Sequence, residues 1–149
     1  MPINYTPEMS ENERRKFPRT SARDIMTANI ISVDPDMNVY DAVEVLLKND
    51  VTGVPVVDSK GNHVGMLSEK DCLKRMLSDL YYTMPDEKVQ NYMSKVIYSI
   101  DIDMDFFMIV RIFVETQYRR LPVLENGKLV GQISRKDCLL AMQKIKNIK

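Results

Sequence analysis

The sequence lacks any long apolar run: no stretch of about 18 or more apolar residues, the length a helix needs to cross a bilayer, occurs in its 149 residues. Its start, MPINYTPEMSENERRKF, is polar and lacks the apolar core of a secretory signal. We therefore expect a soluble, cytoplasmic protein without membrane contact. A chain of this length can bury one substantial core, so we expect internal repeats to share it.

The sequence also has no excess of charge of either sign, and it has little histidine and cysteine. Lysine plus arginine number 21, as do aspartate plus glutamate, which excludes the bulk positive field of a protein that coats nucleic acid. The single histidine, His63, and the two cysteines, Cys72 and Cys138, form neither a CxxC pair nor a cluster that holds a metal. We expect no metal, no cofactor and no catalytic residue, and hence no enzyme.

An internal repeat dominates what is present. GMLSEKDCL at residues 65–73 returns as GQISRKDCL at residues 131–139. The similarity continues on both sides. The offset is 67 residues from Met26 to Met93, and it becomes 66 after a one-residue shortening where DSKGNH faces ENGK. We divide the chain into a polar, basic arm at residues 1–20, a first repeat at 21–86 and a second repeat at 87–149.

Each repeat is predicted to run strand, helix, strand, strand, helix, which gives an α/β chain of the α+β type. In the first, NIISV is a strand, Asn38 caps a helix, VPVVD and HVGMLS form a hairpin, and SEKDCLKRMLSDLY is the closing helix. In the second, Asp105 is the cap and LPVLENGKLVGQIS is the hairpin. The buried helix faces are predicted to be Val39, Ala42, Val43, Leu46 and Leu47, and Phe106, Ile109, Val110, Phe113 and Val114.

The first helix of the second repeat is apolar nearly all round. Besides its predicted buried face it carries Phe107, Met108 and Ile112. Such a helix needs a second partner surface, because these side chains would otherwise leave an apolar patch in water. That partner is either the other repeat or the N-terminal arm, or else a second copy of the chain in a homodimer.

The paired pattern resembles the tandem cystathionine-β-synthase (CBS) domain pair, the Bateman module, over residues 22–146. The segments that carry the resemblance are DIMTANIISVDPDMNVYDAVEVLLKNDVTGVPVVDSKGNHVGMLSEKDCL and YMSKVIYSIDIDMDFFMIVRIFVETQYRRLPVLENGKLVGQISRKDCL. The resemblance implies two βαββα repeats packed about a pseudo-twofold axis, with adenosine-containing ligands in one or both clefts between them.

Serine and aspartate in the repeated GxxSxxD fit such a ligand. Ser68 and Ser134 stand where a strand becomes a helix, so the first-turn amides form an anion site. Asp71 and Asp137 follow three residues later, and a carboxylate can accept hydrogen bonds from both hydroxyls of a ribose. The same S-x-x-D spacing is also a helix capping box, and the two roles can coexist.

The two predicted clefts differ in charge. Arg119 and Arg120 precede the central strand of the second repeat, where the first repeat has Thr52 and Gly53. In the family, a basic residue at this point often reaches a phosphate, which suits the forked donors of a guanidinium. We expect Ser134, Asp137 and the arginines to hold AMP, ADP or ATP, and Ser68, Asp71 and Thr52 to take a less charged adenosine compound or stay empty. Alternatively, the arginines only end an exposed helix.

The adenine contacts are carried over from the family, which places them before the first strand and on the central strand. The matching positions here are Ile31, Val54, Tyr98 and Leu121. S-adenosylmethionine and NAD are secondary ligand candidates. In the N-terminal arm, Arg15 and Arg19 resemble the RxxxR arm with which PilZ domains hold cyclic di-GMP, although the rest of a PilZ domain is missing.

The leading hypothesis is a stand-alone regulatory module. It senses an adenine nucleotide in the clefts between its repeats, forms a homodimer, and signals through altered packing to an unknown protein partner in trans. The alternatives are a structural dimerisation scaffold without a physiological ligand, and cyclic di-GMP binding through the arginine arm.

Overall fold

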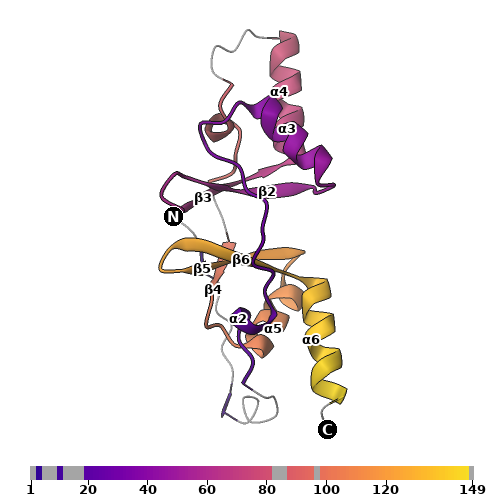
Figure 1. Ribbon diagram of the computed structural model, residues 1–149. Helices are drawn as coiled ribbons and strands as arrows, with labels where there is room; N and C mark the ends of the chain where they lie inside the picture. Colours follow the sequence, from indigo (N-terminus) through magenta and orange to yellow (C-terminus); the bar gives the residue numbers. More distant parts are fainter. Residues whose placement is uncertain (1–2, 5–9, 12–18, 82–86, 96–97, 148–149) are drawn as a thin grey trace. The chain divides into compact units, whose positions relative to one another are not determined.

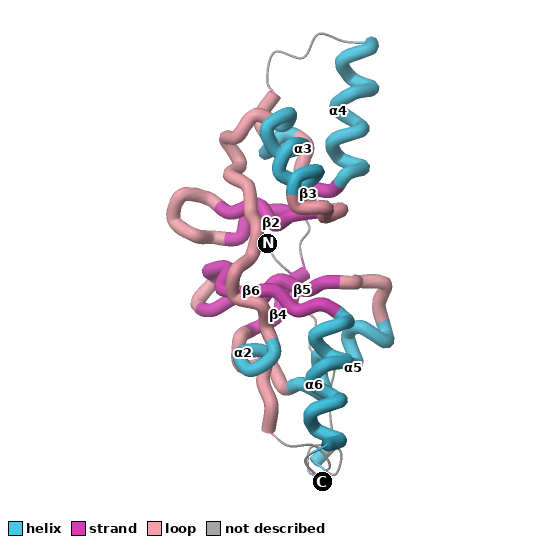
Figure 2. The backbone as a smooth tube through the Cα atoms, turned by 45° about the vertical axis from the view of Figure 1, so that its right-hand side comes forward, coloured by secondary structure: helices cyan, strands magenta, loops and turns pink. Residues whose placement is uncertain are grey.

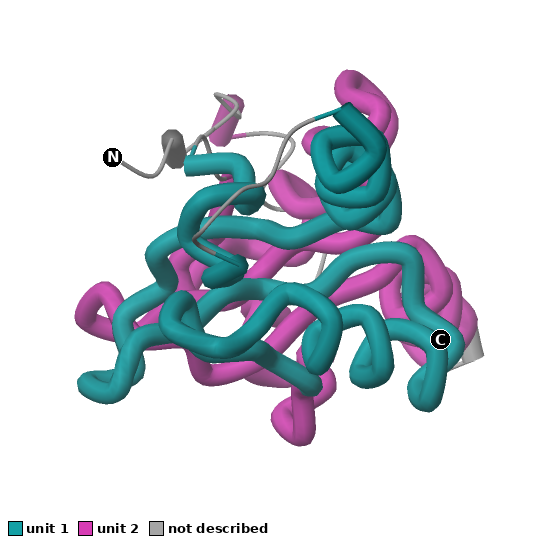
Figure 3. Tube along the Cα trace, turned by 90° about the horizontal axis from the view of Figure 1, so that it is seen from above, with its two compact units in different colours: residues 1–2, 31–97 teal, residues 3–30, 98–149 magenta. Residues whose placement is uncertain are grey.

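The computed structural model describes residues 3–4, 10–11, 19–81, 87–95 and 98–147 (Figure 1). The chain divides into two compact units, which Figure 3 shows in different colours. Unit 1 comprises residues 31–97, and unit 2 combines residues 3–30 with residues 98–149. Each unit contains helices and strands, so the predicted α+β class is confirmed (Figure 2).

Unit 1 is built on an antiparallel hairpin of β2, Gly53–Val57, and β3, His63–Ser68. Two helices accompany it, α3 at Val39–Lys48 and α4 at Glu69–Tyr81, together with the short 3-10 helix η1 at Val89–Asn91. The strand predicted over NIISV is reduced to a single parallel bridge between Val33 and Val56. Val33 is buried there, whereas Ile31 and Ser32 are exposed, so the predicted longer strand was wrong.

Unit 2 is built on a four-stranded sheet in the order β1-β4-β5-β6. Its strands are β1 at Ile3–Asn4, β4 at Tyr98–Asp101, β5 at Arg120–Glu125 and β6 at Lys128–Ser134. β1 and β5 both run parallel to β4, and β6 completes the predicted hairpin with β5. The helices are α2 at Ala22–Ile25, α5 at Phe106–Glu115 and α6 at Arg135–Asn147.

The predicted caps and turns are confirmed. The side chain of Asn38 accepts a hydrogen bond from the amide of Tyr40 at 2.8 Å, and Asp105 does the same for Phe107 at 2.9 Å. In the second hairpin, Asn126 and Gly127 both have positive φ angles, 53° and 79°, as a tight two-residue turn requires. The one-residue difference between the repeats lies in these hairpin turns.

Each unit has its own cluster of buried side chains, so the expectation of one shared core was wrong. Two predicted core residues, Leu47 and Val114, are 75% and 79% exposed. Conversely, Ile112 was placed off the buried face but is only 1% exposed and lies in the core of unit 2. The reason is that α5 buries the positions i, i+3, i+6 and i+7 from Phe106, a face that does not reach the final apolar residue of the helix.

The segment that leads into each repeat packs on the hairpin of the other repeat. In unit 2, Thr27 and Gln132 exchange backbone hydrogen bonds of 2.9 and 3.0 Å. In unit 1, Ser94 and Met66 do so at 2.8 and 3.0 Å. Each compact unit is therefore made from both sequence repeats.

These leading segments explain the glycine of the repeated motif. A Cβ atom on Gly131 would lie 2.5 Å from the sulfur of Met26 and 3.1 Å from the carbonyl oxygen of Thr27. A Cβ atom on Gly65 would lie 2.6 Å from the sulfur of Met93 and 2.9 Å from the carbonyl oxygen of Ser94. The motif has glycine in both places because the segment crosses directly over the strand.

We predict that Gly65→Ala lowers the free energy of unfolding by about 1–3 kcal/mol, because the added methyl group forces the Ser94 carbonyl away. Urea unfolding measures the change. Gly53→Ala is the matched control, since its nearest contact would be 3.3 Å and can relax more easily. Equal losses in the two variants would contradict this account of the crossing.

Candidate functional site

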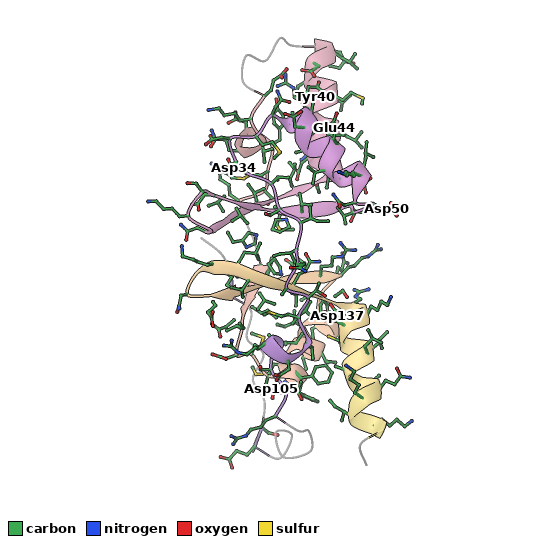
Figure 4. The ribbon with its side chains drawn as sticks, viewed as in Figure 1. Asp34, Tyr40, Glu44, Asp50, Asp105 and Asp137 are labelled. Atoms are coloured by element: carbon green, nitrogen blue, oxygen red, sulfur yellow. The ribbon has the colours of Figure 1, made fainter. Side chains whose placement is uncertain are left out.

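The candidate site in unit 2 lies where β6 ends and α6 begins, and Figure 4 labels Asp137 in the first turn of that helix. One carboxylate oxygen of Asp137, Oδ2, accepts hydrogen bonds from the amide and the hydroxyl of Ser134 at 2.8 and 3.0 Å. The Ser134 hydroxyl in turn accepts a bond from the Asp137 amide at 3.2 Å. This is a reciprocal capping box.

The same arrangement stands at the start of α4 in unit 1. Asp71 Oδ2 accepts bonds from the amide and hydroxyl of Ser68, both at 2.9 Å, and the Asp71 amide donates to Ser68 Oγ at 3.2 Å. Both motifs therefore act as helix caps. In each aspartate the second oxygen, Oδ1, has no hydrogen-bond partner among the residues that the structure describes, so it remains available to a ligand's hydroxyl groups.

Strand pairing brings the residues at the start of each hairpin next to the cap that follows it. In unit 2 these are the arginines predicted to bind phosphate. Arg120 lies opposite Ser134 in the hairpin of unit 2, and the amide of Arg135 donates to the carbonyl of Arg119 at 3.3 Å. In unit 1, Gly53 lies opposite Ser68, and the amide of Glu69 donates to the Thr52 carbonyl at 2.9 Å. The structure thus gathers Arg119, Arg120, Ser134 and Asp137 in one place, and Thr52, Ser68 and Asp71 in another.

The charge at the two caps is opposite in sign. Arg119, Arg120 and Arg135 are all exposed at the start of α6, and none has an ion-pair partner within the described part of the chain. Sequence reasoning missed Arg135. The signal was present, because the aligned residue of the first repeat is Glu69. Three guanidinium groups beside a helix N-terminus make the unit 2 cap suited to anions.

The four residues carried over as adenine contacts do not gather in the same way. The side chains of Val54 and Leu121 are each 1% exposed and belong to the cores of different units, so only their backbone groups can meet a ligand. Tyr98 packs on Tyr118 with ring centroids 4.3 Å apart. Burial, helped by Tyr98, raises the pKa of Tyr118. Ile31 is 37% exposed in unit 1.

A pocket of about 330 Å³ opens beside Asp137 within unit 2. Its apolar lining comes from α2 and α6, and Asp24 and Lys144 add one charge of each sign. The lining residues are Thr20, Asp24, Ile25, Asp137, Leu140, Ala141, Lys144 and Ile145. No pattern in the sequence predicted this pocket.

The environments of His63 and Cys138 disfavour acid–base and nucleophilic catalysis by these side chains. His63 is 7% exposed, and burial lowers its pKa below the ordinary 6.5, so it is neutral at neutral pH. Burial, reinforced by the charge of Asp137, raises the pKa of Cys138 to about 11 and keeps the thiol protonated. Among the described residues, no group of three or more histidine, cysteine, aspartate or glutamate side chains is placed to hold a metal ion.

The repeated caps and crossing segments match a known family. The family model of the CBS domain matches residues 22–78 and again residues 89–144. The chain is a tandem CBS domain pair. Within the described part, no helix has both the length and the apolar character needed to cross a membrane.

Solved CBS pairs share this fold. The chain is 31% identical to CBSX2 in a crystal structure with AMP, with a TM-score of 0.73 over 85% of this chain and 98% of that one. CBSX2 comes from Arabidopsis thaliana. The CBS pair of protein MJ0100, crystallised with 5-methylthioadenosine and S-adenosyl-L-methionine, has a TM-score of 0.67 over 85% of this chain and 98% of its own. At 18% identity it shows the fold alone.

Curated relatives include longer proteins. The A-adding tRNA nucleotidyltransferase of Aquifex aeolicus is 29% identical over 130 residues. That match takes in 87% of this chain but only 15% of the enzyme. The CBS pair is therefore the shared part, and the activity of the whole enzyme does not follow from it.

We predict that Asp71→Ala and Asp137→Ala each lower the free energy of unfolding by about 0.5–2 kcal/mol without nucleotide, because each removes the same capping box. Urea unfolding of the two variants beside the wild type tests this. The repeat supplies the control, since the two losses should be similar. A loss at one position only would contradict equivalent structural roles for the two aspartates.

Proposed function

We propose that this CBS pair is a regulatory module that binds an adenine nucleotide at the start of α6. Asp137 accepts hydrogen bonds from the ribose hydroxyls through Oδ1, while Oδ2 stays in the capping box. Arg119, Arg120 and Arg135 bind the phosphates. AMP, ADP and ATP are the ligands we favour over S-adenosylmethionine and NAD.

One observation carries this proposal: a carboxylate with a free oxygen stands beside three exposed guanidinium groups that have no ion-pair partner in the described part of the chain. A nucleotide joins a diol to phosphates, so its two halves match these two kinds of group. The AMP complex of CBSX2, at 31% identity, supports the choice of ligand.

The unit 1 cap is the weaker site in this proposal. It has the same aspartate geometry but Glu69, Gly53 and Thr52 in place of the three arginines. A phosphate placed there would meet the Glu69 carboxylate and gain no guanidinium. The two outcomes expected for this cap are therefore a less charged adenosine compound or no ligand.

The site contains binding groups but no residue equipped for turnover. Serine and aspartate are held in the capping box, and the Cys138 thiol next to Asp137 is protonated. We therefore propose a regulatory output, in which the ligand alters packing that a partner protein detects. Cyclic di-GMP binding through the arm is an alternative; Arg15 lies outside the described residues, and Arg19 is exposed.

We predict that AMP raises the melting temperature of the protein, because ligand at about one hundred times its dissociation constant adds about 2.7 kcal/mol of stability. A thermal-shift screen would compare AMP, ADP, ATP, S-adenosylmethionine, NAD and cyclic di-GMP. Asp137→Ala should abolish the shift, and Arg120→Ala should weaken it most for ATP.

Asp71→Ala is the matched control, since it removes an equivalent cap and should retain the shift. If no adenosine compound stabilises the wild type, the proposal is wrong and a structural scaffold is the better account. A shift with cyclic di-GMP alone would favour the arginine arm instead.

We also propose that two copies associate through α4. Five of its large apolar side chains, each at least 58% exposed, repeat at i, i+3, i+4, i+7 and i+8: Leu73, Met76, Leu77, Leu80 and Tyr81. Together they leave on the order of 500 Å² of apolar surface in water, a large patch for a monomer. This surface differs from the predicted interface on α5. Of the three residues predicted there, Ile112 is buried in the core of unit 2, so that part of the prediction was wrong. Phe107 and Met108 are half-buried, and an interface through these two residues remains a prediction.

We predict that the double substitution Met76→Asp and Leu80→Asp converts a dimer into a monomer, because it places charge in the centre of this apolar face. Light scattering coupled to size-exclusion chromatography would give the mass. Asn126→Asp, in the exposed turn between β5 and β6, adds the same kind of charge elsewhere and should leave the dimer intact. A wild-type monomer, or a dimer that survives the double substitution, would contradict the α4 interface.

A further inference from the structure

The pocket beside Asp137 has a counterpart in unit 1, and the repeat allows the two to be compared residue by residue. Backbone contacts fix the correspondence. The amide of Phe106 donates to the Thr20 carbonyl at 2.7 Å, and the amide of Val39 donates to the Glu87 carbonyl at the same distance. Position 20 in unit 2 therefore corresponds to position 87 in unit 1, and position 25 corresponds to position 92.

In unit 1 this space is filled by Arg75, which is only 2% exposed. Its guanidinium donates to the Tyr92 hydroxyl, lies 5.4 Å from the centre of that ring, and forms ion pairs with Glu87 at 3.0 Å and Asp79 at 2.8 Å. Glu87 is held further by Asn38, whose side-chain amide donates to it at 2.9 Å. The charges and hydrogen bonds around the buried guanidinium fix it in place.

In unit 2 every one of these groups is replaced by a smaller or less polar one. Ala141 stands in the place of Arg75, and Thr20, Ile25 and Ile145 stand in the places of Glu87, Tyr92 and Asp79. These four residues all line the 330 Å³ pocket. The pocket exists because none of the described residues places a side chain in this space as Arg75 does in unit 1.

The pocket continues the face of α6 that carries Asp137. Leu140, Ala141, Lys144 and Ile145 follow Asp137 at helical spacings of three, four, seven and eight residues. The arginine cluster lies at the start of the helix, where Arg135 is the first residue and Arg120 pairs with Ser134. A nucleotide with its ribose on Asp137 and its phosphates on the arginines therefore has its base end free to turn towards an apolar pocket.

We infer that this pocket receives the base of the nucleotide, and that Arg75 excludes a base from the corresponding place beside Asp71. The inference rests on the proposed function and deepens it, because it makes Ala141 a determinant of binding and gives one nucleotide per chain. The base packs against Ile25, Leu140 and Ala141 in the apolar part of this pocket.

The test introduces arginine, the residue of unit 1, at position 141 of unit 2. Isothermal titration with AMP should give about one site in the wild type and at least tenfold weaker binding in Ala141→Arg. An added positive charge would by itself strengthen the binding of an anion, so a loss reports the filled pocket. Met142→Arg is the matched control: it puts the same side chain on the next residue of α6, which is 55% exposed, and should leave affinity unchanged.

Thermal unfolding without nucleotide shows whether Ala141→Arg folds, and Ala141→Leu replaces it if it does not, with a weaker loss expected. AMP binding that depends on Asp137 but survives filling of the pocket would overturn this inference alone. Two equivalent sites in the wild type would also overturn it. Absence of AMP binding in the wild type would overturn it together with the proposed function.

Discussion

The close crossing of a backbone segment over a glycine is the constraint on which both units depend. Thr27 pairs with Gln132 over Gly131, and Ser94 pairs with Met66 over Gly65, so neither sequence repeat forms its unit alone. The crossing also sets the geometry of the caps. The glycine strand leads directly into Ser68 or Ser134, and a strand held from one side presents the serine and aspartate at a fixed place.

The repeat separates what is structural in the motif from what is functional. Both aspartates make the same capping hydrogen bonds, so the cap explains why serine and aspartate occur twice. It does not explain the arginines, which stand at one cap only, or the contrast between Arg75 and Ala141. The two copies of one scaffold thus differ: unit 2 has a basic cap beside an open pocket, and unit 1 has an acidic cap beside a space that Arg75 fills.

Local sequence signals predicted the local structure well. Asn38 and Asp105 cap their helices because a side-chain acceptor at that position needs only the next turn of backbone. Tertiary features were harder. Ile112 was misplaced because helix periodicity alone does not say which side of an all-apolar helix faces the core. The Arg75 cluster and the pocket were missed because they join residues 87–92 or 20–25 to a distant helix, which no local pattern reveals.

The central claim is that one nucleotide binds at the start of α6. A crystal structure of the protein grown with AMP tests it most directly. The account predicts ribose hydroxyls within hydrogen-bond distance of Asp137 Oδ1, the phosphate among Arg119, Arg120 and Arg135, and Arg75 still paired with Glu87. AMP bound at Asp71 instead, or a phosphate held away from all three arginines, would contradict it.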